Sequence, residues 1–557
     1  MTMPPPASAS PPSVQSLDRR GLFRAGLLGA GLAALPVAAA AAQERGFTHG
    51  VASGEPSANS VLLWTRFASG DPVKLRYEVS DSMDFAKVAA SGDVEATPAR
   101  DGCVKPVAAG LAPDRWYYFR FIAPDGSMSD IGRTRTLPMG DTSRFRMAVV
   151  GCSNIGFGWF NAYAHIAAAD AFDLVVHTGD YIYEYGAGTY PAEGEAVAGR
   201  TLVPQTEIIA LADYRLRYAA YRADPDLQRL HQLYPMIAVW DDHETANDSY
   251  RDGAENHDPA TEGTWDMRKR VAMQAYHEWM PVSDAPWAAY EIGNLATLFR
   301  LETRLTARTK PFDLTTIIAR GGDNPAAMMA ALDAFRDGEW RDENRTLMGA
   351  AQEAWLAAGM ARSRKEGKTW QVLAQQVIMA SLSLPKGIAD NLSDGMPAYI
   401  RKRLLAAAAT SRAGLPFNMD AWDGYPAARA RLLKSAQETD ANLIVLAGDS
   451  HNGWASELDN EGAAAGVEFA GHSVTSPGAE GYLPWIKPAD FAAQSVSRNP
   501  QLQWANTGQR GYMAVELTPA SATSEYRFVS GVKTRSATLA SAQRISTKAG
   551  SARLDIG

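Results

Sequence analysis

The clearest pattern in the sequence is a short apolar run, mostly β-branched, that ends abruptly in glycine and polar residues. Runs of this length and continuity predict buried strands of an α/β sheet. Ligands of such sheets lie at the carboxyl edge, where strands end and loops begin. The runs are Met147–Val150, Leu174–His177, Met236–Trp240 and Leu443–Ala447.

Residues able to bind a metal follow each of these runs. A single acidic strand end is common in α/β proteins. Strand ends that also carry cysteine, tyrosine and histidine indicate metal binding rather than a solvated loop. In chain order, the residues that follow the runs are Cys152; Asp180 and Tyr183; Asp241, Asp242 and His243; and Asp449 and His451.

Before this region the pattern changes to short alternating segments separated by Gly, Pro, Asp and Ser. Such spacing is typical of a small all-β sandwich. We therefore expect a β-sandwich domain over residues 46–138, a catalytic domain over residues 143–530 and a C-terminal tail over residues 531–557. The alternating segments are Ser60–Phe67, Val73–Ser80, Val104–Ala108, Trp116–Ala123 and Ser129–Thr136.

Helical patterns separate further strands in the catalytic region, which predicts a mixed α/β (α+β) fold with late antiparallel strands. The expected helices are Asn161–Ala169, Thr206–Leu230, Trp265–Trp279, Leu347–Arg364 and Ala427–Glu438. The expected further strands are Phe299–Leu305, Trp370–Met379, Gly466–Pro477, Gly511–Leu517 and Ser524–Val529.

The first 42 residues resemble a twin-arginine export signal, because Arg19 and Arg20 precede a weakly apolar, Ala/Gly-rich stretch that ends near Ala42. The alternative is a transmembrane anchor, but Pro36 and the alanine content make this stretch marginal for crossing a bilayer. We expect the twin-arginine machinery to export the folded protein to the periplasm or the medium. After cleavage no stable membrane anchor should remain.

Composition limits the classes of partner and supports a thiolate ligand. The chain has 557 residues and a net charge of −8, which argues against nucleic acid as a standing partner. Its only cysteines are Cys103 and Cys152. A disulfide between them would remove the soft ligand at the first strand end, so we favour a metal thiolate at Cys152.

The candidate ligands fall into two chemical groups. Thiolate and phenolate donors suit ferric iron or another transition metal, whereas carboxylates suit calcium, magnesium or manganese. Asp180 would bridge the two groups. Two adjacent cations are what phosphate-ester hydrolysis requires, because they neutralise the phosphate and lower the pKa of a bound water. His243, between acidic neighbours, is the candidate general acid for the leaving alkoxide.

These motifs carry a family resemblance. They resemble the ordered motifs of the calcineurin-like metallophosphoesterases and, more narrowly, of the alkaline phosphatase D family. Cys152, Asp242 and Asp449 stand where the broad superfamily has other residues, and these substitutions mark the narrower family. The motifs are Gly151-Cys152, Gly179-Asp180-x-x-Tyr183, Asp241-Asp242-His243-Glu244 and Gly448-Asp449-x-His451, with agreeing stretches at 49–56, 301–304 and 422–426.

The resemblance implies a four-layer αββα core, one ferric ion with one or two calcium ions, and cleavage of phosphate mono- or diesters. The implied iron ligands are Cys152, Asp180, Tyr183 and His451. The implied calcium ligands are Asp180, Asp242 and Asp449, and Asp241 could replace or join Asp242.

Other residues near the motifs allow two interpretations each. Asn247 could orient phosphate or cap a turn, and Arg304 and Arg308 could bind phosphate or pair with acids. The leading hypothesis is an exported phosphoesterase that releases phosphate from small organic esters. A phosphodiesterase or phospholipase-D-like hydrolase on the same metal core is the alternative enzyme, and a metal-dependent surface or binding protein is the alternative of another class.

Overall fold

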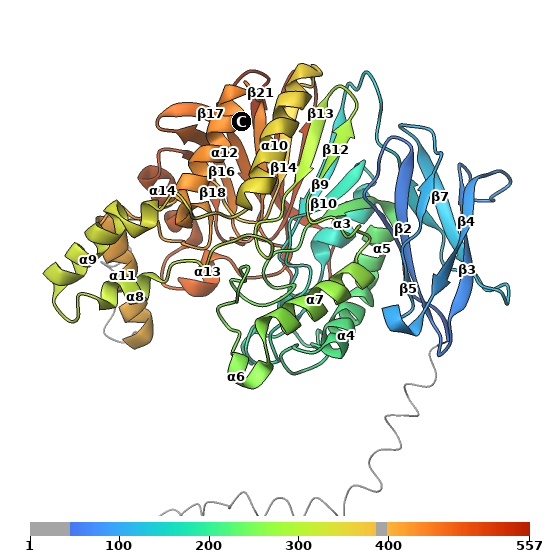
Figure 1. Cartoon of the computed structure of the whole chain (residues 1–557), viewed down its shortest axis with the longest axis horizontal. Coiled ribbons are helices and arrows are strands. Elements are labelled where there is room, and N and C mark those ends of the chain that lie inside the picture. Colours follow the sequence, from blue (N-terminus) through green and yellow to red (C-terminus); the bar gives the residue numbers. More distant parts are fainter. Residues whose placement is uncertain (1–44, 386–397) are drawn as a thin grey trace, which may run out of the picture. The chain divides into compact units, whose positions relative to one another are not determined.

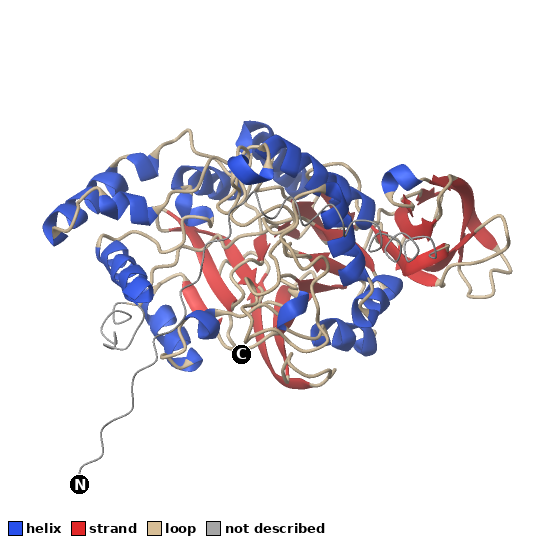
Figure 2. Cartoon of the chain, turned by 90° about the horizontal axis from the view of Figure 1, so that it is seen from below, coloured by secondary structure: helices blue, strands red, loops and turns tan. Residues whose placement is uncertain are grey.

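The computed structural model of this chain describes residues 45–385 and 398–557. The predicted export signal over residues 1–42 therefore lies outside the described residues. Among the described helices, none is long and apolar enough to cross a membrane. Figure 1 shows the order of the elements along the chain, and Figure 2 shows helices flanking the strands.

Three of the four predicted apolar runs form the centre of a ten-stranded sheet, and the fourth, Leu443–Ala447, belongs to a second sheet. The core strands of the first sheet are β9 (Phe145–Val150), β10 (Leu174–His177), β11 (Pro235–Ala238), β19 (Gly511–Leu517), β20 (Ser521–Val529) and β21 (Leu539–Lys548). The order is β21-β20-β19-β9-β10-β11, continued by β1-β2-β5. Strands β9, β10 and β11 are parallel, so their carboxyl ends share one edge.

A seven-stranded sheet faces the first one. Its strands are β12 (Ala288–Ile292), β13 (Ala296–Arg300), β14 (Trp370–Ala374), β15 (Leu443–Ala447), β16 (Gly453–Asn460), β17 (Ala463–Ala470) and β18 (Leu502–Asn506), in the order β12-β13-β14-β15-β17-β16-β18. Its centre, β13-β14-β15-β17, is parallel. One buried apolar cluster joins the sheets, with Val149 and Val176 from the first and Val372 and Leu446 from the second.

Helices cover the outer face of each sheet. The first sheet packs on α3 (Asn161–Ala169), α4 (Leu211–Arg222), α5 (Pro225–Leu233) and α7 (Trp265–Trp279). The second packs on α10 (Gly349–Lys365), α12 (Pro426–Glu438) and α14 (Pro488–Arg498). The predicted four-layer αββα core is therefore confirmed. The other helices are α6 (Pro259–Glu262), α8 (Leu314–Ala319), α9 (Pro325–Asp337), α11 (Ala398–Arg412) and α13 (Ala479–Tyr482).

The N-terminal region is a β-sandwich that shares a sheet with the catalytic region. One side consists of β1 (Gly46–Gly54), β2 (Ser60–Ala68), β5 (Cys103–Val104) and β6 (Val107–Ala109); the other consists of β3 (Val73–Ser80), β4 (Val88–Ala96), β7 (Trp116–Ile122) and β8 (Gly132–Arg135). Leu63 and Phe119 belong to the buried cluster between them. Because β1 pairs with β11 through Ser53 and Pro235, the first side continues the large sheet.

Several segments differ from the pattern expected from sequence, among them the strands predicted over Trp370–Met379 and Gly466–Pro477, which end at Ala374 and Ala470. The single helix predicted over Thr206–Leu230 is wrong, because Asp224 caps a new helix whose first residue is Pro225. The strand predicted over Phe299–Leu305 ends at Arg300, and a loop follows. Residues 531–557 include β21, which pairs antiparallel with β20 and extends the first sheet.

Candidate metal centre

The loops that follow parallel strands of both sheets bring the predicted ligands together. Cys152, Asp180, the Asp241–His243 stretch and Asp449 follow β9, β10, β11 and β15, respectively. Ligand atoms within each of three groups lie within 4.8 Å of one another. The groups are Cys152, Asp180 and His451; Asp180, Asp242 and His243; and Asp241, Asp242 and Asp449. Asp180 and Asp242 each belong to two groups, so the groups form one continuous cluster.

The backbone is strained where it presents these ligands. Cys152, Asp180, Asp449 and His451 have φ values of 57°, 56°, 60° and 60°. A side chain in this left-handed region costs of order 1–3 kcal/mol, and such strain concentrates at functional sites. This placement of four candidate ligands therefore supports a functional role for the cluster.

Small residues let the strand ends of the two sheets approach. The hydroxyl oxygen of Thr178 lies 2.6 Å from the position a Cβ would take at Gly151, and 2.5 Å from that at Gly448. Both distances are shorter than a real Cβ tolerates, so a larger residue at either glycine would push the loops apart. These glycines directly precede Cys152 and Asp449.

Tyr183 joins the group that contains the thiol. Its hydroxyl donates to Asp180 Oδ2 at 3.1 Å, lies 3.3 Å from His451 Nε2 and accepts from Ser476 Oγ at 2.8 Å. His451 Nδ1 is 2.8 Å from the carbonyl oxygen of Pro477. Because a carbonyl only accepts, Nδ1 carries the proton and Nε2 keeps the lone pair that a metal needs. Burial lowers the pKa of His451 to about 3, which keeps the ring neutral.

Buried acids crowd together in the rest of the cluster. Asp180 Oδ1 and Asp241 Oδ2 are buried without a hydrogen-bond partner. Burial raises the pKa of Asp241 to about 6, and burial with neighbouring carboxylates raises the pKa of Asp180 well above its usual range. Burial and then Asp180 raise the pKa of the Cys152 thiol. A cation would reverse these shifts, so the unpartnered oxygens and the donor set fit bound metal ions.

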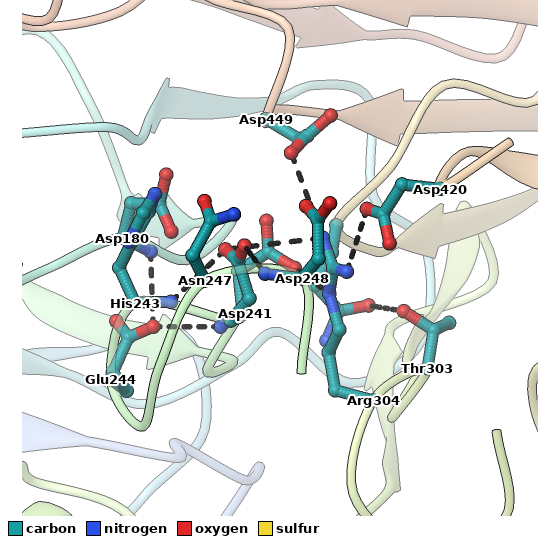
Figure 3. Close-up of polar contacts among 12 residues, drawn as sticks. Asp180, Asp241, His243, Glu244, Asn247, Asp248, Thr303, Arg304, Asp420 and Asp449 are labelled. Atoms are coloured by element: carbon teal, nitrogen blue, oxygen red, sulfur yellow. Dashed lines mark hydrogen bonds and ion pairs between the residues drawn. The ribbon is translucent and has the colours of Figure 1, made fainter. Parts of the chain in front are cut away.

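Arg304, predicted as a substrate-binding residue, contacts acids in the structure. Its Nε donates to Asp241 at 2.5 Å and its Nη1 to Asp420 at 2.6 Å. Its Nη2 lies 3.6 Å from Asp449. Figure 3 shows the guanidinium between these carboxylates. Arg304 is fully buried, and Arg308 likewise pairs with Asp420, at 2.7 Å.

His243 has a carboxylate partner that the sequence interpretation missed. Its Nδ1 lies 2.7 Å from Oε2 of the fully buried Glu184. Burial alone lowers the pKa of His243, but Asp242 and Glu184 outweigh it and raise the pKa well above its usual range. The backbone amide of Asn247 and the side-chain amide of Asn256 donate to Oε1 of Glu184, at 2.7 and 2.8 Å, respectively. The contact with Glu184 therefore fixes the orientation of the imidazole and favours its protonated form. The available signal was the position of Glu184 next to Tyr183.

Two other acids, whose roles the sequence interpretation missed, hold residues around the cluster in place. Glu244 accepts from the backbone amides of Tyr181 and Asp241 at 2.6 and 2.8 Å, and thereby joins the loops after β10 and β11. Its place in the Asp-Asp-His-Glu motif could have indicated this role. Asp420 has no local sequence signal, because it reaches Arg304 only through the fold.

A cavity of about 730 Å³ opens onto the cluster. Asp180, Asp242, His243, Asp449 and His451 line it, and Asn247 does as well. No lysine or arginine is among its lining residues in the described part of the chain. At the described lining, an anionic ligand would therefore meet several carboxylates and no cationic side chain other than histidine.

Comparison with known proteins agrees with this geometry. A model described as "PhoD-like phosphatase" matches residues 147–526, and one described as "PhoD-like phosphatase, N-terminal domain" matches residues 32–138. The chain belongs to the PhoD-like phosphatase family. The family predicted from the strand-end motifs is therefore confirmed, and with it the enzyme class, a hydrolase of the phosphatase type.

Two relatives illustrate the similarity. Alkaline phosphatase D of Bacillus subtilis (strain 168) is 33% identical over 510 residues, which cover 86% of this chain and 77% of the relative. A solved structure of PhoD is 30% identical, has a TM-score of 0.75 and is matched over 92% of both chains. The mixed α/β fold and its N-terminal sandwich therefore agree with a structure of this family.

Proposed function

We propose that this chain is an exported, metal-dependent phosphoesterase that hydrolyses small phosphate esters and releases phosphate. One observation carries the proposal. The cavity opens onto clustered buried carboxylates, one of which, Asp180, also belongs to the group that contains the Cys152 thiol, and its described lining includes no lysine or arginine. Such a site attracts phosphate only when cations occupy it.

The chemistry of the donor groups suggests which residues would hold which metal. Cys152, Asp180, Tyr183 and His451 would hold a ferric ion, because thiolate, phenolate and imidazole suit a transition metal. Asp180, Asp242 and Asp449 would hold calcium, with Asp241 beside them. When bound, adjacent cations neutralise charge on the phosphate, lower the pKa of a coordinated water and align the reacting groups.

His243 would supply the proton that the leaving alkoxide needs. Glu184 occupies Nδ1, so Nε2 is the ring nitrogen available for proton transfer, and the residue lines the cavity. The Glu184 carboxylate at Nδ1 raises the pKa of His243 and so favours the protonated ring that a general acid needs. General-acid help of this kind contributes about 10²–10⁴-fold to the rate.

Arg304 and Asn247 would have different roles. Arg304 would position Asp241 rather than bind the substrate, since its buried guanidinium is paired with acids and is not among the cavity-lining residues. The side chain of Asn247 lines the cavity and donates to Glu255 at 3.2 Å. Its second amide hydrogen would donate to an oxygen of the bound ester.

Export is the second part of the proposal. The paired Arg19 and Arg20 and the Ala/Gly-rich stretch after them favour twin-arginine export of the folded enzyme. This route suits a protein that acquires its metals before it crosses the membrane. The enzyme would then act in the periplasm or the medium.

A substrate and metal panel tests the proposal. The purified protein should hydrolyse nitrophenyl phosphate and alkyl phosphates, lose activity after chelation, and regain it with calcium. Bis(nitrophenyl) phosphate on the same sample separates monoester from diester preference. Full activity after exhaustive removal of metals would contradict the metal dependence, and inactivity of the metal-loaded protein on all esters would contradict the proposed function.

A further inference from the structure

The cavity at the metal centre has a second, chemically different part. Apolar side chains from three segments line this part of the cavity. These segments are separate in sequence from those that carry the candidate metal ligands. Two follow β14, one precedes α12, and two belong to the α13–α14 region. We call this set the apolar wall: Ile378, Leu382, Phe417, Leu483 and Phe491.

Hydrogen bonds fix the loops that carry the apolar wall. The amide of Leu382 donates to Asp423 at 2.9 Å, and the amide of Phe417 donates to the carbonyl of Leu382 at 3.2 Å. Asn499 accepts from the amide of Ser383 at 2.7 Å and donates to its carbonyl at 2.9 Å. The wall is therefore preformed. Ile378, Leu382 and Phe491 are buried, whereas Phe417 is 41% exposed, so Phe417 presents its ring most openly.

The size of the cavity leaves room for more than a phosphate group. At about 730 Å³ it falls within the range of sites that bury a whole small molecule, about 300–1,000 Å³. A phosphate at the metal cluster would fill only a small part of it. The remaining volume must accept the alcohol part of the ester.

The charge of the cavity lining further limits the chemical class of the alcohol part. Besides the metal-ligand candidates, Asp248, Glu255 and Asp423 add negative charge to the cavity, and its described lining includes no lysine or arginine. Among the described lining residues, a second phosphate on the substrate would therefore meet acids and no lysine or arginine. Ser383 and Asn418 also line the cavity and offer partners to a polar group on the alcohol, whereas the apolar wall gains only from an apolar group.

We propose, building on the phosphoesterase function above, that the preferred substrate carries one phosphate and an apolar alcohol chain that lies on the apolar wall. The wall thus determines specificity, and the metal cluster performs the hydrolysis. Each methylene that leaves water on binding contributes about 0.8 kcal/mol, which corresponds to about a fourfold gain in affinity.

A homologous series of straight-chain alkyl phosphates, from ethyl to octyl, tests this inference on the metal-loaded enzyme. These alcohols have nearly equal pKa values, so the leaving group is constant and only the apolar area changes. We expect kcat/KM to rise by up to about fourfold per methylene until the chain fills the wall. A hydroxyl at the far end of the longest chain should cancel much of the gain.

Two outcomes separate the inference from the function on which it rests. Turnover that does not change with chain length would overturn the apolar-chain inference and leave the phosphoesterase function intact. No turnover of any ester would instead overturn the proposed function.

Variants of the wall give a second readout. Phe417→Ser and Leu483→Ser should each lower the ratio of octyl to ethyl phosphate kcat/KM by about tenfold or more. The ratio is measured within one sample, so partial misfolding does not change it. Met139→Ser is the matched control, because Met139 is 70% exposed and is not among the cavity-lining residues. Equal ratios in all three variants and the parent would contradict the assignment.

Discussion

The contact between His243 and Glu184 gives a prediction that can be followed from structure to rate. Glu184→Gln keeps the size of the side chain but removes the charge that faces His243 Nδ1 at 2.7 Å. Hydrogen bonds to charged groups contribute about 1.5–3 kcal/mol. If that energy is lost from the transition state, turnover of alkyl phosphates should fall by about 10- to 100-fold.

The pH dependence should change in a defined direction. The Glu184 carboxylate helps to raise the pKa of His243, so its removal lowers that pKa. A general acid acts only while protonated, and activity is lost as pH rises through its pKa. The alkaline limb of kcat/KM for alkyl phosphates should therefore begin at lower pH in the variant.

The assay compares two leaving groups. Nitrophenolate leaves without a proton, so Glu184→Gln should affect nitrophenyl phosphate much less than ethyl phosphate. Glu461→Gln is the matched control, because this acid is exposed and is not among the cavity-lining residues. An equal loss on both substrates, or an unmoved alkaline limb, would refute the positioning role of Glu184.

Three further predictions concern the proton donor, the buried arginine and the export signal. His243→Ala should retain its metals and lose about 10²–10⁴-fold on alkyl phosphates but less on nitrophenyl phosphate, and an equal loss on both would count against a general acid. Arg304→Met should destabilise folding by about 3–5 kcal/mol, because it leaves Asp241 and Asp420 buried without their partner. Thermal unfolding checks this, with the exposed Arg251→Met as control. Arg19→Lys combined with Arg20→Lys should trap the precursor inside the cell, and undiminished export on cell fractionation would exclude the twin-arginine route.

Strands, caps and ligands could be predicted from the sequence where their signal lies within a few neighbouring residues. An apolar run that ends in Gly-Cys or Gly-Asp contains both the strand and its ligand within a few residues, so the cluster around Asp180 could be predicted from the order of residues alone. The break before Pro225 was equally local, and its signal, an Asp-Pro pair that caps a helix, was present in the sequence.

Contacts between distant segments could not be predicted in this way. Asp420 acts through Arg304, and Glu184 acts through His243, and in each case the partner lies on another loop. The pairing of β1 with β11 joins residues about 180 positions apart, and β21 follows a stretch with little hydrophobic pattern. Local hydrophobic periodicity does not encode which strands pair. The fold decides these partners.

The metal content and visible spectrum of the active enzyme test the central claim most directly. The protein as isolated should contain about one iron per chain and be coloured, because thiolate and phenolate ligands give a ferric ion low-energy charge-transfer absorption. Iron should remain through dialysis, whereas chelation should remove calcium and activity reversibly. Cys152→Ser should lose the colour and most of the iron, and Cys103→Ser should keep both. A colourless, fully active enzyme that contains only zinc or magnesium would contradict the assignment of Cys152 and Tyr183 as iron ligands.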